Sequence, residues 1–195
     1  MDNSKARIGL FGGSFDPVHL GHLLIAQAAR EELGLTRLFF IPAAKSPFKL
    51  GNMPAPARER LRLLRLALAG QTAYEIDEQE MDRGGISYTI DTVRDYCRRM
   101  PGGEFFYLIG ADHVPQLPHW REAEELARLL QFVVIPRPGE VITLLPPPFR
   151  IRALRGFPLR ISSSQIRERI RAGQAIDSLV PPAVAEAIQN NRLYL

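Results

Sequence analysis

Short apolar runs, separated by longer amphipathic segments, constrain the fold of this chain more than any other feature. Each run is continuous, brief and bounded by charged, glycine or proline residues, which is typical of strands. The predicted strands lie near residues 7–11, 37–41, 73–77, 104–109 and 131–135. A continuous apolar run suits a strand that is buried on both faces, as strands are in parallel sheets covered by helices.

The segments between these runs follow the period of amphipathic helices. The predicted helices are HLLIAQAAREEL near 19–33, APARERLRLLRLALAG, YTIDTVRDYCRRM, WREAEELARLL, SSSQIRERIRAG and PPAVAEAIQNN. Glycines at positions 34, 70 and 173 are expected to end three of them. Alternating strands and helices predict an α/β fold, with a Rossmann-like, doubly wound, mostly parallel sheet and helices on both faces.

The length and composition bound the class of protein. With 195 residues, no internal repeat and no flexible linker, we expect one domain over residues 1–195. The net charge of +4 comes from scattered basic and acidic residues, which argues against a nucleic-acid partner. Cys97 is the only cysteine, so the chain has no internal disulfide and no cysteine cluster for zinc.

Hydropathy adds an expectation about location. No apolar run has the length of a signal peptide or a membrane span, so we expect a cytoplasmic protein without a membrane partner. The sequence leaves open whether the chain forms a homo-oligomer.

The stretch GGSFDPVHLGH combines a glycine pair with helix-start residues. Gly12 and Gly13 follow the first predicted strand and would let the chain turn while phosphate oxygens approach backbone amides. We expect Asp16 to cap the next helix, with Pro17 in its first turn. The stretch matches neither the G-x-G-x-x-G fingerprint nor the P-loop.

Two histidines follow at this helix start. His19 and His22 are three residues apart, so their rings should lie on one side of a helix, and Gly21 leaves room for a flat group. Imidazole N–H groups and a positive helix end can stabilise the charge that builds up during transfer at an α-phosphate. Metal sites usually gather three or more ligands, and the remaining histidines are His113 and His119, so we assign no metal ligand.

A second polar segment, ISSSQIRERI, lies near the end of the chain. Ser162, Ser163 and Ser164 offer hydroxyl groups and backbone amides at a predicted helix start. Arg167 lies one turn further on, where its guanidinium can reach the β- and γ-phosphates of a nucleotide and help pyrophosphate to leave.

Both segments resemble signatures of the nucleotidylyltransferase superfamily. GGSFDPVHLGH is similar to its H-x-G-H signature, and ISSSQIRERI to its I-S-x-[ST]-x-I-R signature. The resemblance implies a Rossmann-like nucleotidyltransferase domain and direct in-line attack on the α-phosphate of a nucleoside triphosphate. It also implies release of pyrophosphate with Mg²⁺ as cofactor.

Further segments resemble the bacterial nicotinate-nucleotide adenylyltransferases. These segments are ISYTIDTV, LIGADHVPQLPHW, PRPG and the tail LVPPAVAEAIQNNRLYL. The resemblance implies that ATP and nicotinate mononucleotide react to give deamido-NAD and pyrophosphate in NAD biosynthesis. The alternatives are a related adenylyltransferase acting on nicotinamide mononucleotide or phosphopantetheine, and a nucleotide-binding regulator without turnover.

The resemblance also implies roles for individual residues. Catalytic roles fall on His19, His22 and Arg167. ATP-binding roles fall on Gly12, Gly13, Ser14, Phe15, Gly21, Gly110, Asp112, Ser162, Ser163 and Ser164, with Asp112 on the ribose hydroxyls. Substrate-binding roles fall on Lys45, Lys49, Thr89, Trp120 and Arg121.

The substrate-binding roles differ from residue to residue. Thr89 and the backbone amide of Arg121 would contact the nicotinate carboxylate, and the flat indole of Trp120 would stack on the cationic pyridine ring. In KSPFK, Phe48 stands where many members of the family have histidine, so the sequence leaves open which lysine of the segment contacts phosphate.

Overall fold

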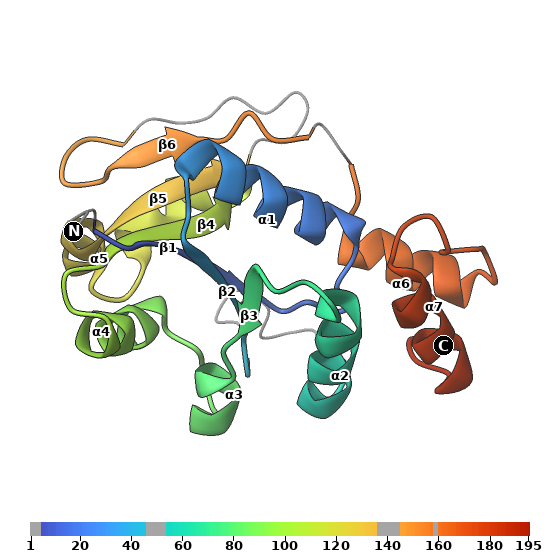
Figure 1. The fold of residues 1–195 in the computed structure, drawn as a ribbon. Helices are drawn as coiled ribbons and strands as arrows, with labels where there is room; N and C mark the ends of the chain where they lie inside the picture. Colours follow the sequence, from blue (N-terminus) through green and yellow to red (C-terminus); the bar gives the residue numbers. More distant parts are fainter. Residues whose placement is uncertain (1–4, 46–53, 136–144, 158–159) are drawn as a thin grey trace.

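The computed structural model describes residues 5–45, 54–135, 145–157 and 160–195. Within these ranges, six strands form one parallel sheet in the order β3-β2-β1-β4-β5-β6 (Figure 1). The strands are β1 (Arg7–Gly13), β2 (Arg37–Pro42), β3 (Tyr74–Ile76), β4 (Glu104–Gly110), β5 (Leu130–Ile135) and β6 (Ile151–Ala153). The predicted parallel sheet is confirmed, and its strand order is that of a Rossmann fold.

Helices connect the strands. They are α1 (Leu20–Leu33), α2 (Ala57–Leu68), α3 (Gln79–Arg83), α4 (Thr89–Arg99), the 3₁₀ helix η1 (Ala111–His119), α5 (Ala123–Leu129), α6 (Ser163–Arg171) and α7 (Pro182–Asn190). α1 ends at Gly34, whose φ of 59° is left-handed, as the sequence predicts. No helix in the described ranges is both long and apolar enough to cross a bilayer.

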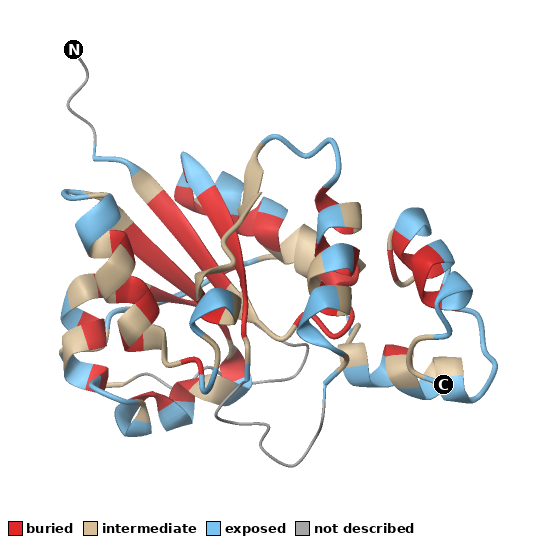
Figure 2. Cartoon of the chain, turned by 90° about the horizontal axis from the view of Figure 1, so that it is seen from below, coloured by how far each residue is buried: buried red, intermediate tan, exposed pale blue. Residues whose placement is uncertain are grey.

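Hydrophobic side chains pack on both faces of the sheet, as a doubly wound fold requires. Along β4, Phe106 and Leu108 join a core with α1, α2, α6 and α7, whereas Phe105, Tyr107 and Ile109 join a core with α4, η1 and α5. Figure 2 shows the buried strands between these helices. The alternation arises because successive side chains of a strand point to opposite faces.

Several short elements do not appear in the sequence pattern. β6 has three residues and two of them are exposed, so no apolar run marks it. α3 has five residues, and η1 contains Pro115 and Pro118, which interrupt a helical period. The predicted strands and longer helices are present with small shifts at their ends.

The sheet topology places a crevice beside β1. The chain winds outward from β1 to β2 and β3, and then returns to β4 on the other side of β1 (Figure 1). Ligands of such folds bind at this reversal, beyond the carboxyl ends of the strands. Gly12, Gly13 and Gly110 occupy those strand ends.

Candidate functional site

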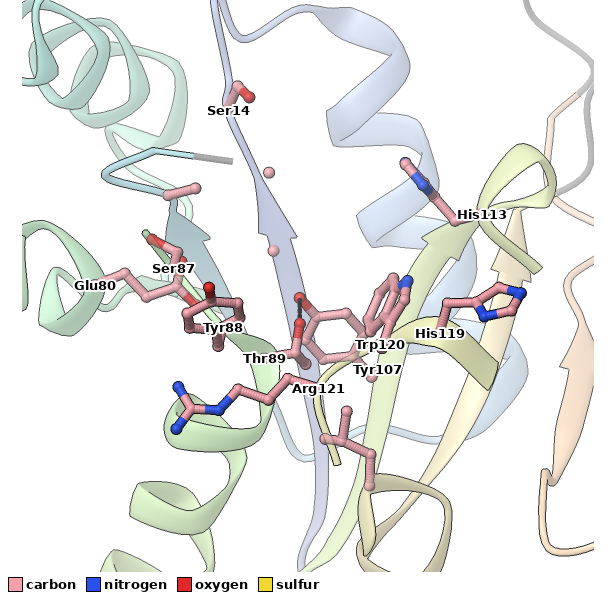
Figure 3. A pocket seen from close by; sticks show the side chains of 14 residues that line it. Ser14, Glu80, Ser87, Tyr88, Thr89, Tyr107, His113, His119, Trp120 and Arg121 are labelled. Carbon is pink, nitrogen blue, oxygen red and sulfur yellow. Dashed lines mark hydrogen bonds between the residues drawn. The ribbon is translucent and has the colours of Figure 1, made fainter. Parts of the chain in front are cut away.

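A cavity of about 230 Å³ opens at the carboxyl ends of β1 and β4 (Figure 3). Its wall includes Gly12 and Gly13 from β1, the segment 87–89 before and at the start of α4, and Trp120 after η1. The topology and the cavity therefore agree on the position of the candidate site.

The glycines that end β1 make room for side chains of the protein itself. Gly12 and Gly13 lie inside β1 and pair with β2, so the prediction that they turn the chain after the strand is wrong. A Cβ on Gly12 would lie 2.3 Å from the Tyr107 hydroxyl oxygen, and one on Gly13 would lie 3.1 Å from the Phe15 ring. The chain turns at Asp16 and Pro17 instead, just after Phe15, which is buried with a left-handed φ of 45°.

The two histidines lie together at the start of α1. His19 is the residue that precedes the helix, and His22 is in its first turn. Their rings stack with centroids 3.7 Å apart, as the i, i+3 spacing predicts. The His22 ring nitrogen Nδ1 accepts a hydrogen bond of 3.2 Å from the His19 backbone amide, which fixes the orientation of the ring.

Hydrocarbon surrounds part of this pair. His19 is 4% exposed, and burial lowers the pKa of its imidazole to about 4. His22 is half-buried and packs against the rings of Phe11 and Phe15, at centroid distances of 5.8 and 5.0 Å. His19 is therefore neutral near pH 7 and offers a single N–H donor.

Gly21 is buried between the histidines. A Cβ there would lie 3.0 Å from His19 Nδ1 and 3.6 Å from the Ile161 Cβ. The space beside Gly21 thus holds the chain's own side chains, which brings Ile161 and the segment ISSSQIRERI against α1.

The prediction that Asp16 caps α1 with Pro17 in the first helical turn is wrong. The helix begins at Leu20, and the Asp16 carboxylate accepts a hydrogen bond of 3.1 Å from the Ala55 amide. Asp16 and Pro17 instead receive side chains from α6, because Arg167 Nη1 donates to the Asp16 carbonyl oxygen at 2.6 Å.

The serines of α6 have different partners. The Ser162 hydroxyl accepts from the Gln165 amide at 3.2 Å, which confirms the predicted serine cap. The Ser163 hydroxyl donates to the Pro17 carbonyl oxygen at 2.9 Å, and the Ser164 hydroxyl accepts from Arg167 at 3.2 Å. These contacts place the start of α6 against the turn that follows β1, although 146 residues separate Ser163 from Pro17.

Aromatic side chains from β4 and from the end of η1 form part of the cavity wall. The Trp120 ring meets Tyr107 edge to face at a centroid distance of 6.1 Å, and His113 at 6.4 Å (Figure 3). The Thr89 hydroxyl lies 3.4 Å from the Tyr107 hydroxyl. His119 also lines the cavity, so both histidines outside the H-x-G-H segment border the site.

Arg121 and Tyr88 lie on the rim. The Arg121 guanidinium carbon is 4.8 Å from the Tyr88 ring centroid, and Nη1 is 3.7 Å from an Asp91 carboxylate oxygen. Both residues line the cavity, and Arg121 Nε also lies 3.7 Å from a Glu122 carboxylate oxygen, so the guanidinium over the Tyr88 ring is flanked by two acids.

The remaining predicted site residues lie around this region. Gly110 ends β4, where a Cβ would lie 2.4 Å from the Asp112 carboxylate, and Asp112 is exposed in η1. Lys45 is exposed, and its carbonyl oxygen accepts from the Ser87 amide at 3.0 Å. Lys49 and Phe48 lie outside the described residues.

Sequence reasoning missed buried polar residues in the cavity wall and next to it. Glu80 and Tyr107 line the cavity, and burial raises the pKa of both side chains. Arg60 is 1% exposed and donates to the carbonyl oxygens of Ser14, Ala44 and Ala55 at 2.7, 3.3 and 3.1 Å. In the sequence, Tyr107 has the pattern of a core residue, and Glu80 and Arg60 that of surface charges.

The described side chains form no protein-based metal centre. Across residues 5–45, 54–135, 145–157 and 160–195, no group of three or more His, Cys, Asp or Glu side chains is placed to hold a metal ion. His113 and His119 therefore have no third such side chain with which to complete a zinc site.

The family model that matches the chain is described as cytidylyltransferase-like and covers residues 10–169. A probable nicotinate-nucleotide adenylyltransferase from Geobacillus kaustophilus is 41% identical over 188 residues, which are 96% of this chain and 86% of the relative. A protein of the same description from Opitutus terrae is 38% identical over 190 residues, covering 96% of this chain and 97% of the relative.

A solved structure has a similar fold. It is the Plasmodium falciparum nicotinic acid mononucleotide adenylyltransferase complexed with NaAD, which superposes with a TM-score of 0.79 over 98% of both chains. Its sequence identity is 17%, so this likeness concerns the fold.

Proposed function

Since this chain belongs to the nicotinate-nucleotide adenylyltransferase family of cytidylyltransferase-like proteins, we propose that it transfers the adenylyl group of ATP to nicotinate mononucleotide. The products are deamido-NAD and pyrophosphate, as in NAD biosynthesis. We propose that residues 1–195 act as one nucleotidyltransferase domain. The substrates imply a cytoplasmic enzyme, and the absence of a nucleic-acid partner stays a prediction.

The observation that carries this proposal is the convergence of two distant segments on the turn after β1. The stacked rings of His19 and His22 lie at the start of α1, and Arg167 reaches the Asp16 carbonyl oxygen from α6. Imidazole donors, a helix N-terminus and a guanidinium thus gather around one turn, as a polyphosphate site requires.

In the proposed reaction, a phosphate oxygen of the mononucleotide attacks the α-phosphorus of ATP. A new P–O bond forms as the bond from the α-phosphorus to the oxygen bridging to the β-phosphate breaks, and pyrophosphate leaves with that oxygen. The attacking phosphate is already an anion, so the protein needs no general base. His19, His22 and Arg167 stabilise the charge that develops on the phosphate oxygens.

The cavity beside β1 suits the second substrate, nicotinate mononucleotide. Trp120 and Tyr107 offer flat aromatic surfaces, which suit a cationic pyridinium ring. Thr89 and the backbone amide of Arg121 would supply a hydroxyl and an N–H donor for the nicotinate carboxylate. The resemblance at Thr89 and Trp120 favours the acid mononucleotide over its amide. Gly12, Gly13 and Ser14 lie on the β1 side, where the phosphates would approach.

We propose that Mg²⁺ arrives with ATP. The described side chains offer no cluster of ligands for it, so phosphate oxygens and water are its expected ligands. We propose that Asp112 contacts the ribose of ATP from the end of β4, and that Ser162, Ser163 and Ser164 line the path of its phosphates.

Pyrophosphate release from ATP tests this proposal. Separate reactions contain nicotinate mononucleotide, nicotinamide mononucleotide or phosphopantetheine, and the acid mononucleotide should react fastest. Arg167→Gln should lower kcat about a hundredfold, as loss of a donor to developing charge usually does. Arg171→Gln, at an exposed position of the same helix, is the matched control and should stay within about twofold. The proposal would be refuted if the enzyme released no pyrophosphate with any of the three acceptors.

A further inference from the structure

Arg60 is a buried cation beside the candidate site, and the reaction described above gives it no role. It lies in α2 and is 1% exposed. Burying a charged group is unfavourable unless hydrogen bonds replace those that it makes to water. Each nitrogen of the guanidinium donates to a backbone carbonyl oxygen, Nη1 to Ser14 at 2.7 Å, Nη2 to Ala44 at 3.3 Å and Nε to Ala55 at 3.1 Å. Arg60 therefore contacts three separate segments of the main chain through one planar group.

These segments meet where β1 and β2 stop pairing. The pairing extends to Gly13 in β1. Ser14 is the next residue, lies just past the end of β1 (Figure 3) and lines the cavity. Ala44 lies just beyond the end of β2, and Ala55 precedes α2. The guanidinium therefore joins the segment that follows β1 to the segment that follows β2 and to the start of α2.

The residues on either side of this segment have anchors of their own. The Gly13 carbonyl oxygen accepts a hydrogen bond of 2.9 Å from the amide that follows β2, and the Asp16 carboxylate accepts one of 3.1 Å from the Ala55 amide. Neither bond involves the peptide group between Ser14 and Phe15. The bond to the guanidinium is the contact that acts on this peptide group through its carbonyl oxygen.

That bond sets the direction of the Ser14 carbonyl and of the amide that follows it. A peptide group is planar, and its C=O and N–H point in opposite directions. The Ser14 carbonyl oxygen points to the buried guanidinium of Arg60, so the N–H of Phe15 points away from it. Phe15 has a φ of 45°, a conformation that a residue with a side chain keeps only where neighbouring contacts hold it. A short hydrogen bond from a charged donor to the preceding carbonyl is such a contact.

We infer that Arg60 is a positioning residue, which holds the Ser14–Phe15 peptide so that the Phe15 amide is turned toward the phosphates of ATP. A phosphate oxygen would accept from this amide, as phosphate oxygens accept from backbone amides beside helix starts. Arg60 does not contact the nucleotide in this role, because its guanidinium is buried and bonded to the main chain. The inference rests on the proposed function, which places the phosphates of ATP at the end of β1.

Direct binding of ATP to Arg60→Lys tests the inference. Lysine keeps the positive charge, but its single nitrogen cannot reproduce the planar fork that bonds three carbonyl groups. In equilibrium dialysis with Mg²⁺, the Kd for ATP should rise about tenfold, as expected when one hydrogen bond to a charged group is lost. The Kd for adenosine, which has no phosphates, should stay within about twofold. Arg62→Lys, at an exposed position of the same helix, is the matched control and should change neither constant.

NMR of the unmodified protein provides a second measurement, which is informative even if Arg60→Lys does not fold. Addition of ATP alone should move the Phe15 amide proton downfield, because the amide then donates to an anionic acceptor. In folded Arg60→Lys this movement should be smaller at saturating ATP. A purely structural role of Arg60 would instead lower the melting temperature and leave the Kd for ATP unchanged.

Three results would overturn the inference. They are an unchanged Kd for ATP in folded Arg60→Lys, an equal weakening of ATP and adenosine, and a Phe15 amide proton that does not move when ATP binds. These experiments use ATP without an acceptor, so they are separate from the test of the proposed function. Normal binding of ATP without turnover of any pyridine mononucleotide would refute the proposed function alone. Normal turnover with an unchanged Kd in Arg60→Lys would refute the inference alone, and a protein that binds no ATP would refute both.

Discussion

At the scale of single residues, the candidate site contains polar side chains that are buried in the folded protein. His19 is buried beside His22, and the aromatic rings of Phe11 and Phe15 surround the outer face of the pair. A histidine in such a place is kept neutral, because charging it would leave a cation in a hydrophobic environment. In the proposed reaction, His19 would therefore contribute a directed N–H group and no full positive charge.

The lowered pKa of His19 predicts how the stability of the protein depends on pH. The unfolded chain takes up a proton at His19 near pH 6.5, whereas the folded protein does so near pH 4. Between these values the unfolded state binds more protons, so the free energy of unfolding decreases as the pH falls. From pH 8 to pH 5 the loss assigned to His19 is about 2 kcal/mol.

Urea unfolding of the wild type and of His19→Asn at both pH values measures this loss. His19→Asn should lose less stability than the wild type by about 2 kcal/mol over the same interval. The comparison removes the contributions of other titrating groups, which both proteins share. Equal losses in the two proteins would mean that the His19 ring has access to water in solution.

At the scale of helices and strands, the start of α6 is stabilised by its cap. Ser162 accepts from the Gln165 amide, and the Gln165 side chain accepts from the Ser162 amide at 3.1 Å, so each residue satisfies a donor of the other. Ser162→Ala should lower the free energy of unfolding by about 1 kcal/mol, whereas Ser162→Asp should retain most of it. Chemical denaturation of the three proteins provides the measurement, and equal stability of the alanine variant would contradict the prediction.

The length of each helix and strand decides how well the sequence predicts it. The apolar runs that form β1, β2, β4 and β5 are long enough to carry a pattern, and α1, α2 and α6 have clear amphipathic periods and end signals. β6 has no such pattern because it is a short edge strand, with Arg152 and Ala153 exposed. Gly12 and Gly13 were misplaced because glycine permits both strand and turn, and only the Tyr107 and Phe15 side chains beside them decide between the two.

The residues of the candidate site also differ in how well the sequence predicts them. The two histidines and Arg167 carry local spacings that predict their grouping, and the structure brings His19 and His22 into ring contact. Glu80 and Arg60 carry no local signal, because a charged residue on a helix is ordinarily exposed. Their burial arises from contacts with segments far along the chain, such as the Arg60 bond to Ser14.

At the scale of the whole molecule, Asp16 connects parts of the chain that the sheet does not join. Its carboxylate binds the Ala55 amide just before α2 and lies 3.6 Å from Arg167 Nη1 on α6. Arg167 also donates to the Asp16 carbonyl oxygen, so α6 is fastened to the turn after β1 both by charge and by backbone. In Figure 1, α6 and α7 lie together at one end of the molecule, and this contact fixes α6 against the turn that follows β1.

A double-mutant cycle on Asp16 and Arg167 tests this connection. Asp16→Asn removes the charge but keeps the backbone carbonyl, and Arg167→Gln removes the guanidinium. The side chains are 9% and 22% exposed, so the pair is less screened than a surface ion pair, and a coupling energy of about 1 kcal/mol in the free energy of unfolding is expected. Glu124 and Arg128 form an exposed pair on α5 at 2.9 Å and serve as the reference, with a coupling of about 0.3 kcal/mol. If both cycles give the same coupling, the Asp16–Arg167 contact does not hold α6 in place, and the alignment of Arg167 with the histidines must depend on the packing of Ile161 and Ile166 instead.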